Sequence, residues 1–314
     1  MVEKTSVLIV DDSALIRQLL TSILSSDPSI EVLGTAPDAL KARELIKKLN
    51  PDVVTLDIEM PKMNGIEFLK KIMKLRPMPV VMISTLTQRG ADITLEALEI
   101  GAVDYVAKPV QDVQRSLQDK AVEIQEKVKT AARAKIKAYE EIEHAVQKKV
   151  IDPIAQDTDI ELIVLGSSTG GVEAIRTVLS GLPNDMPPIC IVQHMPKHFT
   201  STFAKRLNHI TALEVHEAEE MMVLKKGHVY IAPGDQHLRI SKAKGELVCR
   251  LLDGNPVSGH IPSVDVLFDS ACHINPKATI GVMLSGMGRD GAENMKKLRD
   301  AGAYNIGQDE ASCV

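Results

Sequence analysis

Several classes of protein are disfavoured by what this 314-residue sequence lacks. No apolar run approaches the roughly 20 residues that cross a bilayer, and the start, MVEKTSVLIVDD, has charges on both sides of a very short apolar run, unlike a signal peptide. The four cysteines show no C-x-x-C spacing, so neither a zinc site nor a disulfide framework is indicated. A net charge of −5 argues against a basic face for nucleic acid. We therefore expect a cytoplasmic protein in a reducing compartment, with no nucleic-acid partner and no membrane insertion.

The first hundred residues alternate short apolar runs with amphipathic stretches, a rhythm typical of a parallel α/β sheet. The expected strands are 6–10, 31–36, 53–57, 79–84 and 104–108, and the expected helices are 14–26, 38–49, 64–75 and 91–100. Strands that are apolar throughout indicate a sheet covered by helices on both faces. In such a sheet the functional side chains gather at the carboxyl ends of the strands.

The sequence changes in character after about residue 111. The stretch AVEIQEKVKTAARAKIKAYEEIEHAVQKKV contains no glycine or proline, and it interleaves lysine and arginine with glutamate. This composition favours helix and is typical of a solvated spacer. Pro153 then interrupts the pattern and marks a boundary.

The second half of the chain resumes the parallel-sheet rhythm. It begins with an apolar run at 161–166, continues with PPICIVQH and ends with ATIGVMLSGMGRDGAEN, while GHVYIAPGDQHLRISKAKGELVCRLL predicts a β-meander. We therefore predict an α/β protein with two doubly wound parallel-sheet domains. The first covers residues 1–124, a mainly helical linker covers 125–156, and the second covers 157–314.

Acidic side chains follow two predicted strands of the first domain. Asp11 and Asp12 end the first strand and Asp57 ends the third, while Lys108 ends the fifth. Three carboxylates at one sheet edge would raise each other's pKa unless a cation neutralises them, and Mg²⁺ suits such oxygen ligands. Asp57 could then attack a phosphoryl donor as a nucleophile, with Ser84 placed to contact a phosphate oxygen. The alternative is that the aspartates of the first strand cap the following helix.

Four segments of the first domain resemble the receiver domain of bacterial response regulators: VLIVDDSALIR, DVVTLDIEMPKMNGIEFL, PVVMISTLT and GAVDYVAKP. The resemblance implies a flavodoxin-like five-stranded sheet. It also implies that Asp57 accepts a phosphoryl group from a histidine kinase, and that Asp11, Asp12 and Asp57 bind Mg²⁺.

The same resemblance assigns a switch. It implies that Ser84, Tyr105 and Lys108 read out the phosphorylated state and that the peptide bond before Pro109 is cis. Whether residue 84 or residue 85 provides the main hydroxyl for the phosphoryl group stays open. Taken alone, Tyr105 would be interpreted as a half-buried core aromatic.

A polar, glycine-rich turn follows the first apolar run of the second domain. Residues 166–170 read G-S-S-T-G, which fits the G-x-S-x-G pattern of a nucleophile elbow centred on Ser168. The alternative is a phosphate-binding loop. However, Val172 follows Gly171 where a Walker A loop has lysine, and the glycine spacing does not fit a dinucleotide fold. The pattern alone is weak, so the partners of the serine decide between the two.

A nucleophilic serine needs a base and a group that orients the base. His194 ends the strand PPICIVQH at the same sheet edge as Ser168, whereas His198 falls where the next helix should begin. Asp290 follows another strand in a glycine-rich turn, although it could instead cap a helix. The backbone N–H of Met287 in that turn could stabilise an oxyanion. The histidines interpreted as surface or structural residues are His216, His228, His237, His260 and His273.

A receiver followed by GSSTGGVEAI, VQHMP, GHVYIAPGDQHL, PSVDVLF and LSGMGRDGA resembles the chemotaxis protein-glutamate methylesterase (CheB) family. The resemblance covers almost the whole chain except the linker. It implies hydrolysis of glutamate methyl esters on methyl-accepting chemotaxis receptors, with release of methanol, and deamidation of receptor glutamines. It also implies that the receiver inhibits the esterase until Asp57 is phosphorylated. The chain would act in sensory adaptation, as a monomer that needs no cofactor for the esterase step.

The sequence departs from this family in three places. Lys197 and His198 stand where the family usually has Pro-Gly, and Ile261 stands where a basic residue is usual. The chain stops at ASCV, where the family continues for a further strand and helix, so we expect a second domain that is short at its C-terminus. Two other functions are alternatives. One is a non-catalytic two-component output protein with a phosphate- or small-molecule-binding domain; the other, a DNA-binding regulator, lacks a basic helix-turn-helix.

Overall fold

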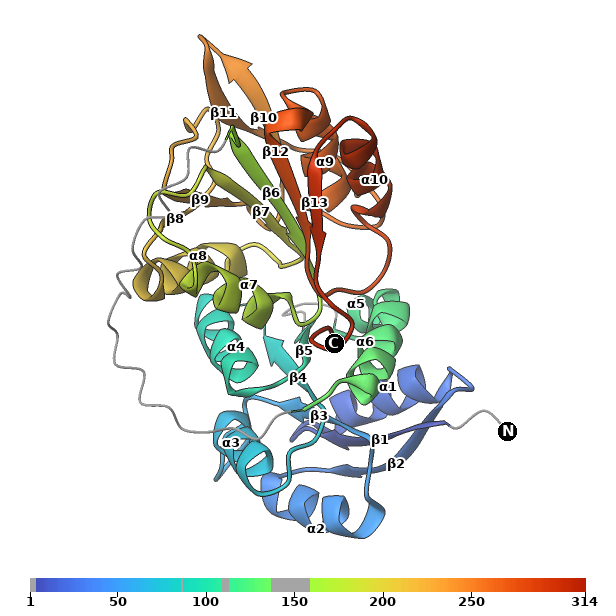
Figure 1. Cartoon of the computed structure of the whole chain (residues 1–314). Helices are drawn as coiled ribbons and strands as arrows, with labels where there is room; N and C mark the ends of the chain where they lie inside the picture. Colours follow the sequence, from blue (N-terminus) through green and yellow to red (C-terminus); the bar gives the residue numbers. More distant parts are fainter. Residues whose placement is uncertain (1–3, 86, 109–112, 137–158) are drawn as a thin grey trace. The chain divides into compact units, whose positions relative to one another are not determined.

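The computed structural model describes residues 4–85, 87–108, 113–136 and 159–314. The chain divides into two compact units between residues 143 and 144. Each unit is an α/β structure built on a parallel sheet, as the alternating strand and helix patterns predict (Figure 1). No helix in the described residues is long and apolar enough to span a membrane.

The first unit has one five-stranded parallel sheet. Its strands are β1 (Thr5–Val10), β2 (Ile30–Ala36), β3 (Val53–Asp57), β4 (Val80–Thr85) and β5 (Asp104–Lys108), in the order β2-β1-β3-β4-β5. The helices are α1 (Ala14–Ser25), α2 (Ala39–Leu49), α3 (Gly65–Leu75), α4 (Gln88–Ile100), α5 (Val113–Asp119) and α6 (Ala121–Arg133). Because β1 pairs Val10 with Leu56 of β3, Asp11, which follows β1, lies beside Asp57, the last residue of β3.

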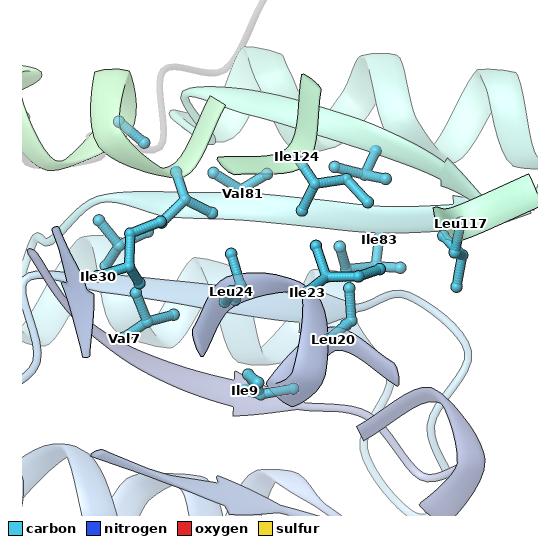
Figure 2. Packing of buried hydrophobic residues seen from close by; sticks show 14 of the residues in the cluster. Val7, Ile9, Leu20, Ile23, Leu24, Ile30, Val81, Ile83, Leu117 and Ile124 are labelled. Carbon is cyan, nitrogen blue, oxygen red and sulfur yellow. The ribbon is translucent and has the colours of Figure 1, made fainter. Parts of the chain in front are cut away.

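One face of this sheet is covered by α1, α5 and α6. Figure 2 shows Leu20 and Leu24 of α1 and Ile124 of α6 against apolar side chains of the sheet such as Val81. The cluster removes these side chains from water, which stabilises the unit by about 25 cal/mol for each Å² of apolar surface buried.

Helix α6 differs from the solvated spacer expected from residue 125 onward. Ile124, Val128 and Ala131 recur every three or four residues and are fully buried in the core of the first unit. The abundant charges of this stretch mask the apolar stripe in the sequence, although such a stripe is the pattern of a packed helix. The predicted domain limits at residues 124 and 157 stay a prediction, and most of the expected linker lies outside the described residues.

The second unit is built on six parallel strands in the order β13-β12-β6-β7-β9-β8. They are β6 (Leu162–Ser167), β7 (Ile189–Gln193), β8 (Glu214–Glu217), β9 (His228–Ile231), β12 (Thr279–Met283) and β13 (Tyr304–Gly307). The helices are α7 (Gly171–Ser180), α8 (Phe199–Ile210), α9 (Val264–Cys272) and α10 (Ala292–Asp300), with a 3₁₀ turn at Pro276–Ala278. The chain moves from β6 to β7 on one side and later returns to β12 on the other. This reversal creates a crevice at the carboxyl ends of β6 and β12.

The segment predicted as a β-meander contributes to two sheets. Only β10 (His237–Ala243) and β11 (Glu246–Leu252) form an antiparallel hairpin. The strand before them, β9, joins the parallel sheet between β7 and β8. The side chain of Tyr230 in β9 is 1% exposed, and burial on both faces distinguishes such a strand from one at a solvated meander.

Candidate active site and candidate phosphorylation site

Three of the predicted site residues meet at the crevice of the second unit. Ser168 follows β6, His194 follows β7 and Asp290 lies in the loop after β12. His194 Nδ1 lies 3.2 Å from Ser168 Oγ, and His194 Nε2 lies 2.8 Å from Asp290 Oδ2. The His194 side chain is 12% exposed and that of Asp290 is 1% exposed. The chain thus brings a hydroxyl, an imidazole and a carboxylate into one hydrogen-bonded row.

The imidazole of His194 has a definite orientation in this row. An ionised carboxylate can only accept, so Nε2 must donate to Asp290 and the neutral ring leaves Nδ1 to accept from the serine hydroxyl. Many serine hydrolases use the two nitrogens the other way round. Either arrangement can take a proton from the serine, because a neutral imidazole always has one donor and one acceptor nitrogen.

Asp290 accepts hydrogen bonds at the N-terminus of α9. Ser263 Oγ donates to Oδ1 at 2.7 Å, Val264 N donates to Oδ2 at 2.7 Å and Asp265 N donates to Oδ1 at 3.0 Å. Burial raises the pKa of Asp290, but the hydrogen bonds from His194, from Ser263 and from the two backbone amides outweigh it and hold the pKa below its usual value. The carboxylate therefore stays ionised beside His194.

The alternative interpretation of Asp290 as the cap of its own helix does not describe its contacts. The residue at the N-cap of α10 is Gly291, with φ of 89°, and the Asp290 side chain instead turns to α9. Ser263 and the backbone amides of the two residues after it were not predicted as site groups. Pro262, Ser263 and Asp265 precede an apolar run, which is the pattern of a helix start and could have revealed an anion-binding helix end.

The side chain of Gln193 holds the serine turn by two hydrogen bonds. Its Nε2 donates to Ser168 O at 2.9 Å, and its Oε1 accepts from Ser167 Oγ at 2.6 Å. A Cβ at Gly171 would overlap Gln193 Oε1, so this glycine leaves room for the glutamine, while Gly170 has φ of 74°. Gln193 was not predicted as a site residue, because an amide one position before a candidate histidine carries no distinctive pattern.

A pocket of about 510 Å³ opens beside the triad. Ser168 and His194 line it together with Met287, whose backbone was predicted to stabilise an oxyanion. Arg289 and Lys296 add positive charge to its wall. The departure at His198 lies at the exposed start of α8 with φ of 74°, outside the hydrogen-bonded row.

One histidine set aside by the sequence analysis lies in the site. The ring of His260 stacks on the ring of His194 with 3.7 Å between their centroids and 12° between their planes. His260 precedes Ile261, the second departure, whose bond to Pro262 is cis. No local pattern predicts this contact, because the loop that carries His260 is about 65 residues further along the chain than β7.

Carboxylates and a lysine also meet at the sheet edge of the first unit. Lys108 Nζ lies 2.7 Å from Asp11 Oδ2 and 2.8 Å from Asp57 Oδ1. Burial raises the pKa of Asp57 to about 6, with a further contribution from Asp11 that the positive charge of Lys108 opposes. Carboxylate oxygens of Asp11, Asp12 and Asp57 lie within 4.8 Å of one another, a hard-oxygen set that fits Mg²⁺. Ser13 is the N-cap of α1, so Asp11 and Asp12 are not its N-cap.

The predicted switch residues lie around this edge. Thr94 of α4 donates to Ser84 Oγ at 2.7 Å, and Thr85 is half-buried at the end of β4. Tyr105 is buried, and Lys127 of α6 lies 4.9 Å from the centre of its ring while donating to its carbonyl at 2.7 Å. The predicted cis bond before Pro109 lies outside the described residues.

Comparison with known proteins gives one family match in each of the two units of the chain. The response regulator receiver domain family matches residues 7–118, and the CheB methylesterase family matches residues 163–314. A protein from Nitrosomonas europaea named protein-glutamate methylesterase/protein-glutamine glutaminase is 52% identical over 316 residues, which cover 99% of this chain and 88% of that protein. A protein of the same name from Methylobacillus flagellatus is 50% identical and covers 98% of this chain and 87% of its own length.

Among solved structures, the crystal structure of the Thermotoga maritima CheB methylesterase catalytic domain is 38% identical. The alignment has a TM-score of 0.48 and covers 49% of this chain and 82% of that one.

Proposed function

Because the chain belongs to the protein-glutamate methylesterase/protein-glutamine glutaminase family and carries a receiver domain, we propose that it is a phosphorylation-activated serine hydrolase of chemotaxis receptors. Its substrates in this proposal are glutamate methyl esters and glutamine amides of methyl-accepting receptors, and its products are methanol or ammonia and a glutamate side chain on the receptor. The observation that carries the proposal is the hydrogen-bonded row of Ser168, His194 and Asp290. The protein would act in the cytoplasm as a monomer, with the receptors and a histidine kinase as partners.

Acyl transfer in this proposal starts at Ser168. As Ser168 Oγ bonds to the ester carbonyl carbon, its proton passes to His194 Nδ1, and Asp290 stabilises the resulting imidazolium. His194 then gives the proton to the departing methoxy oxygen, so methanol leaves and an acyl-serine remains. Water then adds to the acyl carbon and gives a proton to His194 Nδ1. As the bond between that carbon and Ser168 Oγ breaks, Nδ1 returns the proton to Oγ, and a glutamate side chain remains on the receptor. With glutamine as substrate, the leaving group is ammonia.

The negative oxygen of the tetrahedral intermediate needs donors that are already in place. We assign this role to the backbone N–H of Met287, which belongs to the loop lining the pocket beside Ser168. Loss of one such donor typically lowers kcat by about 100- to 1000-fold.

The receiver would control this reaction through Asp57. The carboxylate attacks the phosphorus of a phosphohistidine on the kinase, so that a P–O bond forms while the P–N bond breaks and the imidazole leaves. Asp11, Asp12 and Asp57 would hold Mg²⁺, which supplies positive charge for the carboxylates and the incoming phosphoryl oxygens. Lys108, which bridges Asp11 and Asp57, keeps this charge balanced before the transfer.

The switch assignment extends the same proposal. Ser84, or the neighbouring Thr85, would donate a hydroxyl to the phosphoryl group. Donation by Ser84 would require its hydroxyl to turn from its present contact with Thr94. Tyr105 and Lys108, both in β5, would respond to the change.

Replacement of Ser168 by alanine tests the esterase. The Ser168→Ala variant should lose methanol release from methylated receptor membranes by at least about 1000-fold, because the nucleophile is gone while the fold is kept. The wild-type protein should also be labelled by a serine-directed fluorophosphonate, and the variant should not. Full activity in the variant would refute the assignment, whereas a non-catalytic output protein would release no methanol even with Ser168 present. Ser180→Ala, on the far end of α7, is the matched control.

A further inference from the structure

The stacked histidine is carried by a tight hairpin turn. Val257 N donates to His260 O at 3.1 Å and His260 N donates to Val257 O at 3.0 Å, so these two residues face each other across a two-residue loop. Ser258 and Gly259 at the tip have φ of 53° and 86°. Two successive positive φ values are the signature of a type I′ turn, which holds its flanking residues in a fixed register. The hairpin thus presents His260 at a defined place.

This hairpin is tied to the same elements that hold the site. Ser258 Oγ donates to Asp265 Oδ2 at 2.7 Å, next to the α9 amides that bind Asp290. His237 links the two sides of the loop, since Nδ1 accepts from Ser263 N and Nε2 donates to Asn255 O, each at 3.1 Å. A displacement of the loop would therefore move the carboxylate and the stacked ring together.

The contact with His260 adds a restraint to those that the triad provides. His194 bonds Ser168 through Nδ1 and Asp290 through Nε2, so both hydrogen bonds end on ring nitrogens. They resist a displacement of the nitrogens more strongly than a small tilt of the ring about the line that joins them, which is otherwise opposed by the Cβ–Cγ bond of the side chain. A second ring lying flat on its face at 3.7 Å blocks that tilt by van der Waals contact.

We propose that His260 is a positioning residue for the hydrolysis: its ring face holds the imidazole of His194 in the plane that aligns Nδ1 with Ser168. The proposal rests on the function assigned above to the triad. It requires a flat aromatic face at position 260 and no proton transfer by its nitrogens, so the chemistry of the reaction stays with Ser168 and His194. A misaligned base loses rate without losing substrate affinity, because alignment matters in the transition state.

Three full-length variants test this role with methylated receptor membranes as substrate. His260→Ala should lower kcat on the order of tenfold with little change in KM, because the ring of His194 can then tilt. His260→Phe, which keeps a flat ring, should restore kcat to within about threefold of wild type. His209→Ala, at an exposed position on α8, is the matched control and should behave as wild type.

The outcomes separate this proposal from the proposed function. If wild-type protein releases methanol and His260→Ala keeps the wild-type kcat, the positioning role is refuted while the esterase stands. Equal losses in the Ala and Phe variants would also refute it, because they would show that a nitrogen of His260 is needed. A rise in KM alone would indicate a substrate contact instead. Should the Ala variant unfold, His260→Leu supplies the comparison, with a kcat well below that of the Phe variant expected and an equal kcat refuting the proposal.

Discussion

At the scale of single residues, Asp290 shows how a buried carboxylate can remain charged. Three donors from one short segment, Ser263 Oγ and the amides of Val264 and Asp265, converge on it, and His194 is the fourth. The helix N-terminus adds positive potential at the same point. The carboxylate thus has both the charge that stabilises a protonated imidazole and the fixed position that orients it.

Replacement of Asp290 by asparagine should show how much the negative charge contributes, because the two side chains have nearly the same shape. Asparagine has one acceptor oxygen, and its amide group would face donors, so we expect kcat to fall on the order of 10⁴-fold, as when other serine triads lose this carboxylate. The loss of charge-assisted hydrogen bonds should destabilise the second unit by about 2 kcal/mol at pH 7. Methanol release and urea unfolding measure the two effects.

The pH dependence of that destabilisation follows from the lowered pKa of Asp290. A carboxyl whose pKa is lower in the folded state stabilises the fold above its unfolded pKa, and the contribution disappears as pH falls through the folded value. The difference in unfolding free energy between wild type and Asp290→Asn should therefore shrink as the pH falls below about 4. A difference that stays constant would show that the charge is not its source. Asp253→Asn, at an exposed position, is the control.

The residues that sequence patterns could locate are those in the turns and loops that follow strands. Parallel strands place their carboxyl ends at one edge, so the positions of Ser168, His194 and Asp290 near one another follow from topology. Gln193 and His260 could not be located this way. Their contacts depend on the direction of a side chain beneath a turn and on a hairpin far along the chain, and neither leaves a periodic signal.

At the scale of elements, helix α9 connects the core to the site. It packs across β6, and its first residue, Val264, is 1% exposed in the core while its amide binds Asp290. The close approach is possible because Gly166 of β6 has no side chain: a Cβ there would overlap Val264. The first glycine of the G-x-S-x-G pattern therefore serves helix packing as well as the turn.

Replacement of Gly166 by alanine should affect stability and activity together. The added methyl group would push α9 away from β6, at a cost of about 1–3 kcal/mol in the free energy of unfolding. Because the same helix end holds Asp290, kcat should also fall. Gly254→Ala is the matched control, since a Cβ there meets nothing within 4 Å, and it should change both quantities little. Wild-type kcat in a destabilised Gly166→Ala variant would contradict the link between packing and site.

The sequence pattern of a single segment was least informative where the same pattern fits two different structural roles. The apolar stripe of α6 marks it as a packed helix, but its lysines and glutamates equally suit a spacer, and only the packing of α6 against α1 and the sheet decides between them. Likewise β9 reads as the first strand of a meander, whereas its pairing with β7 and β8 depends on where those strands lie. Pairing between distant segments is not encoded in either segment alone.

At the scale of the whole molecule, one architectural rule places both proposed reactive groups. In each unit the carboxylate or hydroxyl proposed to react lies at the carboxyl edge of a parallel sheet. The first unit gathers like charges, with Asp57 at a pKa of about 6 and Lys108 between two aspartates. The second surrounds one carboxylate with donors. A cluster of carboxylates suits phosphoryl transfer that depends on a metal ion. A carboxylate surrounded by hydrogen-bond donors suits acyl transfer, and none of the groups proposed for that reaction is a metal ligand.

Because the two proposed sites lie in different units, we predict that regulation can be abolished without loss of catalysis. Replacement of Asp57 by asparagine should abolish the stimulation of methanol release by a small phosphodonor, because the amide cannot accept the phosphoryl group, and the unstimulated rate should remain. Chelation of Mg²⁺ by EDTA should have the same effect on wild type, since the carboxylates of Asp11, Asp12 and Asp57 would lose the charge that balances them. Asp119→Asn, at an exposed position on α5, should respond to the phosphodonor like wild type. Stimulation that survives in Asp57→Asn would mean that the receiver acts through another residue, and an unstimulated rate that EDTA abolishes would place the metal in the esterase step.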